Sequence, residues 1–160
     1  MTSRKIIDEF LSQRSLAVVG VSRDRKKFGN VIYRTLKEKG YKVFAVNRNA
    51  DTVEGDSCYH SLGNIPEKVG GVVVCVPPEQ AEHVAQEAVS TGIERMWFQQ
   101  GAASYAALRH CEKGEVKTVS GQCILMFVEP VTSIHRFHRW VWKVIGKYPA
   151  SEPPSSSHPS

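Results

Sequence analysis

The chain has 160 residues, of which 41% are hydrophobic and 23% charged, a size and composition typical of one globular domain. Its apolar runs are shorter than the roughly 20 residues that span a bilayer, and it starts without the apolar core of a signal peptide, so we expect a cytoplasmic protein with no membrane partner. The net charge of +5 comes without the arginine runs or aromatic spacing of nucleic-acid-binding modules, which argues against nucleic acid and favours a phosphorylated small ligand.

The first part of the chain predicts a helix, a buried strand and a second helix. Apolar residues recur at helical spacing in residues 3–12 and again in residues 28–36, where Gly40 is a natural C-cap. Between them, residues 16–19 are a short β-branched run, typical of a parallel strand that is covered on both faces. Gly20 ends this strand.

The loop after this strand is rich in basic residues. Four cationic side chains lie between Gly20 and the next helix: Arg23, Arg25, Lys26 and Lys27. A helix that begins after a strand presents backbone N–H groups and the positive end of its dipole, so the sequence predicts a phosphate-binding loop. A tight turn without a ligand is the alternative. The dinucleotide fingerprint G-x-G-x-x-G is not present, because Ser22 stands at its second glycine position.

The following residues continue the alternation of strands and helices. Four further strands are predicted at residues 42–46, 71–76, 95–99 and 116–119. A helix is predicted from Pro78 to a stop at Gly92, another from an N-cap at Ser104 to Cys111, and the segment 55–65 is predicted to be irregular. This pattern indicates an α/β fold: a Rossmann-like open parallel five-stranded sheet, order 3-2-1-4-5, with helices on both faces.

In such a sheet, ligands bind beyond the carboxyl ends of the strands, at the point where the strand order reverses. We expect four loops to meet there: residues 20–29, 47–49, 76–78 and 99–101. An NAD site has an acidic residue after the second strand, whereas this chain has Asn47 and Arg48. A guanidinium there favours a ligand with an extra ribose phosphate, which means coenzyme A or NADP; a solvated loop arginine is the alternative.

Two further loops have interpretable residues. Val76, Pro77 and Pro78 form a rigid apolar ledge against which an adenine or a pantetheine arm can lie, or the two prolines only set the start of a helix. The amides of Gln99 and Gln100, which precede Gly101, suit an amide-bearing ligand, or cap nearby backbone.

The carboxyl-terminal residues allow several interpretations. Residues 133–145 predict a helix with a basic face that packs in part, contacts the ligand or contacts a second subunit, and a tryptophan there marks a possible homodimer. We expect no metal site; the candidates that the spacing offers are Cys123, His135 and His138. The proline- and serine-rich residues 149–160 are expected to be a disordered tail after a single domain over residues 1–148. The four cysteines lack CxxC spacing and are expected to be free thiols.

Several stretches together resemble a known family. They are VVGVSRDRKKFGN, KVFAVNRNAD, VVVCVPPE, MWFQQGA and GQCILMFVEP followed by HRFHRW. In this order they resemble the stand-alone CoA-binding domain proteins, small Rossmann-type proteins similar to the nucleotide-binding domain of the succinyl-CoA synthetase alpha subunit. The resemblance covers residues 15–149. It implies CoA as the cofactor, bound by the loop after the first strand, and no catalytic partner domain.

We therefore expect a CoA-binding or acyl-CoA-binding module rather than an enzyme. An NADP-dependent oxidoreductase is one alternative, although no proton donor stands out because His60, His83 and His110 are expected on the surface. A regulatory subunit that docks through its basic helix is another. The candidate ligand-binding residues are Gly20, Val21, Ser22, Arg23, Lys26, Lys27, Phe28, Gly29, Asn30, Asn47, Arg48, Val76, Pro77, Pro78, Gln99 and Gly101.

Overall fold

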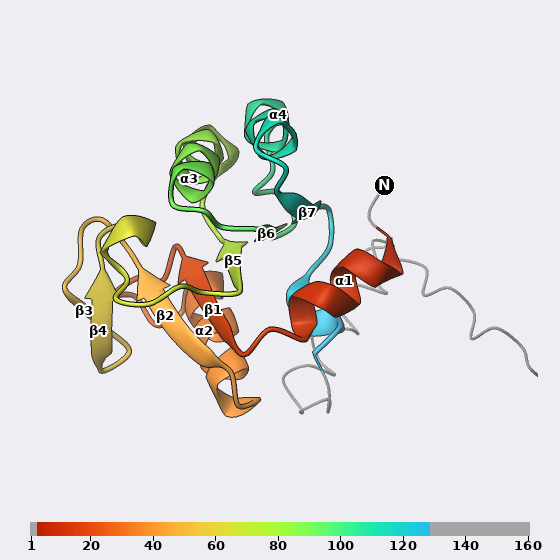
Figure 1. Cartoon of the computed structure of the whole chain (residues 1–160). Coiled ribbons are helices and arrows are strands. Elements are labelled where there is room, and N and C mark those ends of the chain that lie inside the picture. The colour runs from red at the N-terminus through yellow and green to blue at the C-terminus, as the bar shows by residue number, and fades with distance from the viewer. Residues whose placement is uncertain (1–2, 129–160) are drawn as a thin grey trace, which may run out of the picture. The chain divides into compact units, whose positions relative to one another are not determined.

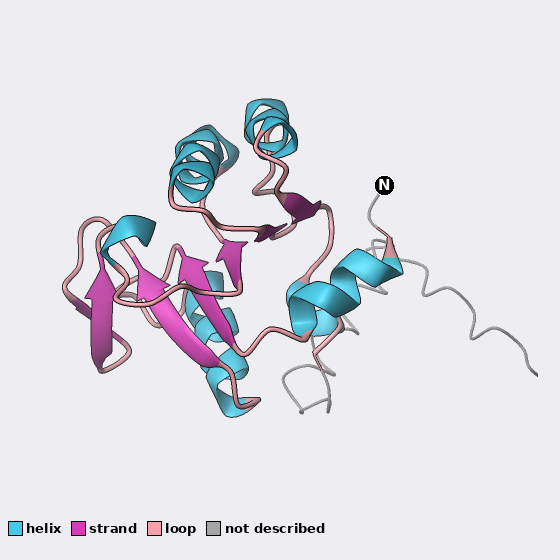
Figure 2. Ribbon diagram, in the orientation of Figure 1, coloured by secondary structure: helices cyan, strands magenta, loops and turns pink. Residues whose placement is uncertain are grey.

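The structure is a computed structural model that describes residues 3–128 of the chain. Along these residues strands and helices alternate, and the strands form a sheet with helices on both faces (Figures 1 and 2). The elements are α1 (Arg4–Leu11), β1 (Ser15–Val19), α2 (Phe28–Glu38), β2 (Lys42–Val46), β3 (Thr52–Val53), β4 (Asp56–Tyr59), η1 (Leu62–Asn64), β5 (Gly71–Val74), α3 (Pro78–Ser90), β6 (Arg95–Phe98), α4 (Tyr105–Lys113), β7 (Lys117–Val119) and η2 (Ile124–Met126). The predicted α/β Rossmann-like class is confirmed.

The helices and the strands shared with the prediction begin and end close to where local sequence signals place them. The hydroxyl of Ser104 accepts a hydrogen bond from the N–H of Ala107 and so caps α4. Pro78 is the first residue of α3. Gly40 and Gly92 follow α2 and α3 in left-handed conformations, with φ of +94° and +80°, which stop each helix.

The predicted number and order of strands are wrong. The described part of the chain has seven strands, in the order β3-β4-β2-β1-β5-β6-β7, instead of five in the order 3-2-1-4-5. The segment 71–76, expected as the third strand at the edge, contributes β5, which lies beside β1. The outer place next to β2 is taken by β4, from a segment that we predicted to be irregular. All pairs are parallel except the hairpin of β3 and β4.

The prediction failed at this hairpin because its turn is atypical. Val53 and Asp56 face each other across a two-residue turn of Glu54 and Gly55, whose φ angles are +53° and +77°. Two left-handed residues in succession are the geometry of a type I′ turn, which favours Asn-Gly or Asp-Gly. A glutamate in the first position is uncommon, and strands of two and four residues are too short to show an alternating pattern.

Small side chains separate the sheet from α3 and α4. Ala81, Ala85 and Ala88 of α3 are fully buried in a cluster with Val74 and Phe98 of the central strands. Alanines at this spacing form one face of a helix and let its backbone approach the sheet closely. The first residues of α3 therefore come close to the carboxyl ends of β5 and β6.

Larger side chains fill the opposite face, where α1 and α2 lie (Figure 1). The ring of Phe10 from α1 packs edge-on against Trp97 of β6, with 5.4 Å between the ring centroids. Ile32 and Leu36 of α2 are fully buried. Together with the first face they give the sheet the double cover that parallel strands require.

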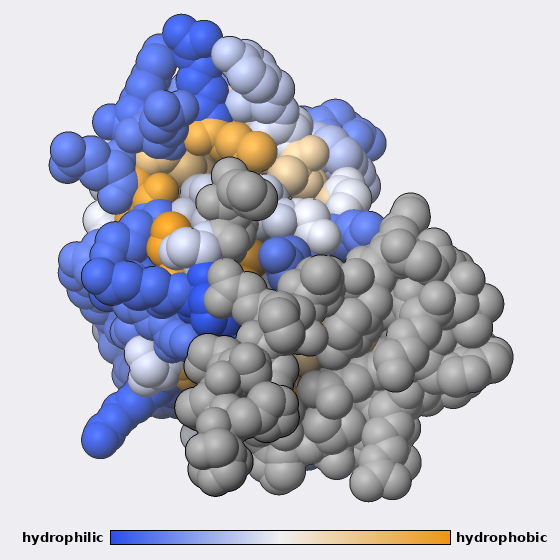
Figure 3. Space-filling model, turned by 90° about the vertical axis from the view of Figure 1, so that its right-hand side faces the viewer, coloured by the Kyte–Doolittle hydropathy of each residue, from blue (hydrophilic) through white to orange (hydrophobic). Residues whose placement is uncertain are grey.

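The outer surface differs from this interior. Seen from the right of Figure 1, the described surface is mostly hydrophilic, with a band of hydrophobic residues below α4 (Figure 3). Among residues 3–128, no helix combines the length and apolar content that crossing a membrane requires. The predicted basic helix at 133–145, the tail at 149–160 and the metal candidates His135 and His138 lie outside the described residues.

We expect Phe10→Ala to lower the free energy of unfolding by about 3–5 kcal/mol, because the change leaves a cavity against Trp97. The neighbouring variant Leu11→Ala is the control, since this side chain is only partly buried. Urea unfolding followed by tryptophan fluorescence measures both. Equal losses would contradict the docking of α1 on β6.

Candidate functional site

The carboxyl ends of the parallel strands open into a cleft of about 1120 Å³. It lies where the chain leaves β1 for α2 on one face of the sheet and β5 for α3 on the other. The loops after β1, β2, β4, β5 and β6 line it, together with one side of α3. The four loops that we expected to meet therefore do so around one opening.

Eleven of the sixteen candidate residues line this cleft. They are Gly20, Ser22, Lys27, Phe28, Gly29, Asn47, Arg48, Val76, Pro77, Gln99 and Gly101. The other five do not: Val21 and Asn30 are buried, Arg23 and Lys26 are exposed on the loop outside the cleft, and Pro78 opens α3.

Two glycines allow β1, α2 and β5 to meet at the base of the cleft. A Cβ on Gly20, whose φ is +108°, would lie 2.6 Å from the carbonyl oxygen of Cys75. A Cβ on Gly29 would lie 2.4 Å from the carbonyl oxygen of Gly20. No real side chain fits at such distances. The first turn of α2 is thus held directly above the end of β1, which is the role of close-packing glycines in nucleotide-binding folds.

The loop between β1 and α2 has a defined conformation. The buried amide of Asn30 accepts a hydrogen bond from the N–H of Ser22 at 2.8 Å and donates to the carbonyl oxygen of Ser22 at 2.6 Å. Farther along, the N–H of Lys26 donates to the carboxylate of Asp24 at 3.0 Å. Asn30, expected beside the ligand phosphates, therefore fixes the backbone of the loop at Ser22.

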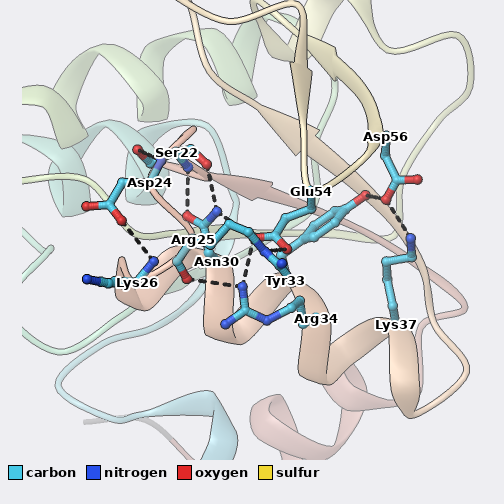
Figure 4. Close-up of polar contacts among 10 residues, drawn as sticks. All are labelled: Ser22, Asp24, Arg25, Lys26, Asn30, Tyr33, Arg34, Lys37, Glu54 and Asp56. Carbon is cyan, nitrogen blue, oxygen red and sulfur yellow. Dashed lines mark hydrogen bonds and ion pairs between the residues drawn. The ribbon is translucent and has the colours of Figure 1, made fainter.

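A carboxylate of the β3–β4 turn completes this network (Figure 4). Glu54, whose side chain is 4% exposed, accepts hydrogen bonds from Asn30 at 2.8 Å, Arg34 at 2.8 Å and Arg25 at 3.1 Å. Burial alone would raise the pKa of Glu54, but the hydrogen bond from Asn30 and the two guanidinium groups hold that pKa below its usual value. This buried anion is therefore charged and paired at neutral pH.

The basic residues near the cleft fall into two groups, according to whether they are paired with another group in the described part of the protein. The guanidinium of Arg25 donates a hydrogen bond to Glu54, so it is paired with a carboxylate of the protein itself. Lys27 and Arg48 line the cleft, and within the described residues neither side chain has an ion pair or a hydrogen bond. They are the two cations that the cleft offers to an anionic ligand.

Two amide side chains that line the cleft are hydrogen-bonded to the protein around it. Asn47 donates to the carbonyl oxygen of Val21 at 2.9 Å and accepts from the N–H of Asn49 at 2.8 Å. Gln99 accepts from the N–H of Ile124 at 2.8 Å and donates to the sulfur of Cys123 at 3.2 Å. For Gln99 the structure thus has the backbone-capping contact that we gave as the alternative.

Sequence reasoning missed the far wall of the cleft. It consists of His60, Ser61, Leu62, Gln80, His83, Val84 and Glu87. The carboxylate of Glu87 accepts a hydrogen bond from the N–H of Leu62 and so ties η1 to α3. His60, expected as an ordinary surface residue, lies with its Nε2 2.8 Å from Asp51. The α3 residues recur at helical spacing beside the buried alanines, and this stripe could have marked the wall in the sequence.

The thiol of Cys75 at the site is not activated. Cys75 lines the cleft, and burial raises the pKa of its thiol well above the usual value, with a smaller effect of Cys123. A thiol of this kind is protonated at neutral pH and is a poor nucleophile. Between residues 3 and 128, no three His, Cys, Asp or Glu side chains are grouped so that they could hold a metal ion.

Comparison with known proteins identifies the family. Residues 14–129 match the family described as CoA binding domain. The chain belongs to this family. The family membership inferred from the sequence motifs is thereby confirmed. The matched residues include the whole of the sheet, from the residue before β1 to the end of the described chain.

Some relatives of this CoA binding domain are much longer than it, and another is similar in length. The domain is 33% identical over 90 residues to the acetate–CoA ligase (ADP-forming) II subunit alpha of Pyrococcus furiosus, and the match covers 56% of this chain and 20% of the relative. The chain thus spans about a fifth of that ligase subunit. An uncharacterized protein of Bacillus subtilis is 27% identical over 123 residues, which is 91% of its length and 76% of this chain.

A solved structure is also similar in sequence and in fold. A conserved hypothetical protein from Pyrococcus furiosus superposes on this CoA binding domain with a TM-score of 0.66 and 42% sequence identity. The match covers 96% of that chain and 69% of this one.

We expect Gly29→Ala to destabilise the CoA binding domain by about 1–3 kcal/mol, because its methyl group overlaps the carbonyl oxygen of Gly20. Gly63→Ala is the control: this glycine has no left-handed φ, and its nearest neighbour to an added Cβ is 3.7 Å away. The control should change stability by less than about 0.5 kcal/mol. Thermal unfolding of both variants provides the comparison.

We expect Glu54→Gln to lower the free energy of unfolding by about 2 kcal/mol at neutral pH, because a charged acceptor of three hydrogen bonds is lost. The pKa of folded Glu54 lies below its usual 4.5, so the carboxylate stabilises the fold above that pH. Its contribution is lost as the pH falls through the folded-state pKa. Urea unfolding of wild type and variant across this range should therefore show the two converging in acid. A difference that does not vary with pH would refute the ionic role of Glu54.

Proposed function

We propose that this CoA binding domain binds CoA, or a CoA thioester, in the cleft at the carboxyl ends of its strands. The observation that supports this most directly is the convergence on one opening of a helix N-terminus, an apolar ledge and two cations that have no partner among residues 3–128. CoA is a diphosphate with a further 3′-phosphate and a long, largely neutral arm, so each part of it has a suitable counterpart.

The diphosphate belongs at the loop after β1. Helix α2 has Lys27 at its N-cap position, and within the described residues the Lys27 side chain forms no capping hydrogen bond, whereas Ser104 caps α4. A phosphate can take the place of a capping side chain because it accepts from first-turn N–H groups and interacts favourably with the helix dipole. The ammonium of Lys27 adds a charge at the same place.

The 3′-phosphate belongs near Arg48. This residue follows β2, lines the cleft and has no acidic partner among the described residues. The position after the second strand receives the adenosine ribose in dinucleotide-binding folds, and an arginine there suits a ribose that carries a phosphate.

The neutral parts of the ligand have apolar surface available. Val76 and Pro77 line one side of the cleft, Leu62 and Val84 another, and Phe28 keeps 42% of its surface exposed at the rim. The adenine ring and the pantetheine arm can lie along such surfaces. We assign binding to this chain and no reaction, because the match to the ligase subunit covers 20% of that relative.

Arg48→Met tests the placement of the 3′-phosphate. We expect the variant to bind CoA about 5-fold more weakly and dephospho-CoA unchanged, since loss of one exposed charge pair costs up to about 1 kcal/mol. Isothermal titration calorimetry of both ligands measures the difference. Lys26→Met is the control, because Lys26 is a basic residue of the phosphate loop that does not line the cleft.

Two results would count against the proposal. Equal weakening for both ligands would remove Arg48 from the 3′-phosphate. Saturable binding of NADPH by a wild-type protein that does not bind CoA would replace CoA with NADP as the cofactor.

A further inference from the structure

Glu54 does not line the cleft, yet its carboxylate accepts hydrogen bonds from three side chains beside the β1–α2 loop, those of Arg25, Asn30 and Arg34 (Figure 4). We propose that Glu54 is a positioning residue, which fixes the β1–α2 loop in the conformation that receives the ligand phosphates. The inference rests on the proposed function in so far as it concerns CoA. The fixing of the loop itself is a property of the ligand-free protein.

The first line of support is the path from Glu54 to the loop backbone. Glu54 accepts from Nδ2 of Asn30, and the same amide donates to the carbonyl oxygen of Ser22 while its Oδ1 accepts from the N–H of Ser22. Asn30 is fully buried. Because the carboxylate accepts only from the NH₂ group, it also fixes which way the amide of Asn30 faces, and hence which group meets the Ser22 N–H.

The second line of support is a separate path to the far half of the loop. Arg34 donates through Nη1 to Glu54 at 2.8 Å and to the carbonyl oxygen of Arg25 at 3.1 Å. The side chain of Arg25 turns back to Glu54 as well. The single carboxylate therefore holds the loop at its beginning, through Ser22, and near its end, through Arg25.

The third line of support is that a glutamate is unfavourable at position 54 in two respects. Glu54 occupies a left-handed conformation, with φ of +53°, that glycine, asparagine or aspartate would adopt more easily. Its negative charge next to a phosphate-binding loop would also repel the ligand. The left-handed backbone is strained for a glutamate, and the negative charge opposes the binding of an anion. The reach of a glutamate side chain to three hydrogen-bond donors accounts for its presence despite both features.

Two explanations of the role of Glu54 predict opposite changes in CoA affinity when its carboxylate is removed. If charge alone governed binding, removal of the carboxylate would free Arg25 and strengthen the binding of CoA. If Glu54 positions the loop, the same change lets the loop adopt other conformations, and their entropy must be lost again on binding. Weaker binding is then expected.

The matched control is Asp56→Asn. Asp56 belongs to the same hairpin and also contacts α2, where it accepts from the hydroxyl of Tyr33 at 2.7 Å and from Nζ of Lys37 at 2.5 Å. These contacts do not involve the phosphate loop. Loss of hairpin docking in general should therefore affect both variants, and loss of loop positioning only one.

We expect Glu54→Gln to bind CoA about 10-fold more weakly than wild type, and Asp56→Asn to bind within about 2-fold of it, in calorimetric titrations of the full chain. Glu54→Asp is the second variant, because aspartate suits the left-handed turn better but is one methylene shorter, and it should weaken binding in the same direction. Equal weakening in the Asp56 variant, or tighter binding by either Glu54 variant, would overturn the inference.

Hydrogen exchange of the ligand-free proteins separates this inference from the proposed function. The amide of Ser22 should exchange about 10-fold faster in Glu54→Gln than in wild type, and at the wild-type rate in Asp56→Asn. A wild-type protein that does not bind CoA would refute the proposed function, and the exchange rates would still decide whether Glu54 fixes the loop. Unchanged exchange at Ser22 would show that it does not.

Discussion

The close approach of three backbone segments at Gly20, Gly29 and Cys75 is the constraint on which the rest of the site depends. A side chain at either glycine would meet a carbonyl oxygen at less than 3 Å, so α2 can begin directly above β1 only because both positions lack a Cβ. This contact decides where the first turn of α2 points. It also sets the width of the cleft between the β1–α2 loop and the start of α3, since Cys75 leads from β5 toward that helix.

The basic side chains around this contact fall into two groups. Arg25 and Arg34 neutralise a buried carboxylate of the protein and hold a loop in place. Lys27 and Arg48 have no such partner in the described chain and face the opening. A count of basic residues in the sequence treats all of them alike. The structure shows which of these cations are paired within the described part of the protein, and this depends on contacts between residues that lie 20 or 29 positions apart in the sequence.

The sequence was most informative where the signals are local. Buried strands, helix caps and the glycine after β1 depend on neighbouring residues, so their positions were predicted closely. The β3–β4 hairpin was missed because a glutamate in a left-handed turn has no common sequence pattern, and the order of strands was wrong as a consequence. Asn30 was assigned to the ligand phosphates because the family resemblance implied it; its contact with Glu54 comes from a hairpin more than twenty residues farther on.

The hairpin also determines how the sheet ends. On that side the last strand, β3, contributes only two residues and runs against the direction of all the others, so few unpaired N–H and carbonyl groups are presented to a neighbouring molecule. Long, regular outer strands are the usual templates for edge-to-edge association of β-sheet proteins. A turn that bends the chain back after so short a strand therefore protects the protein against aggregation on this side.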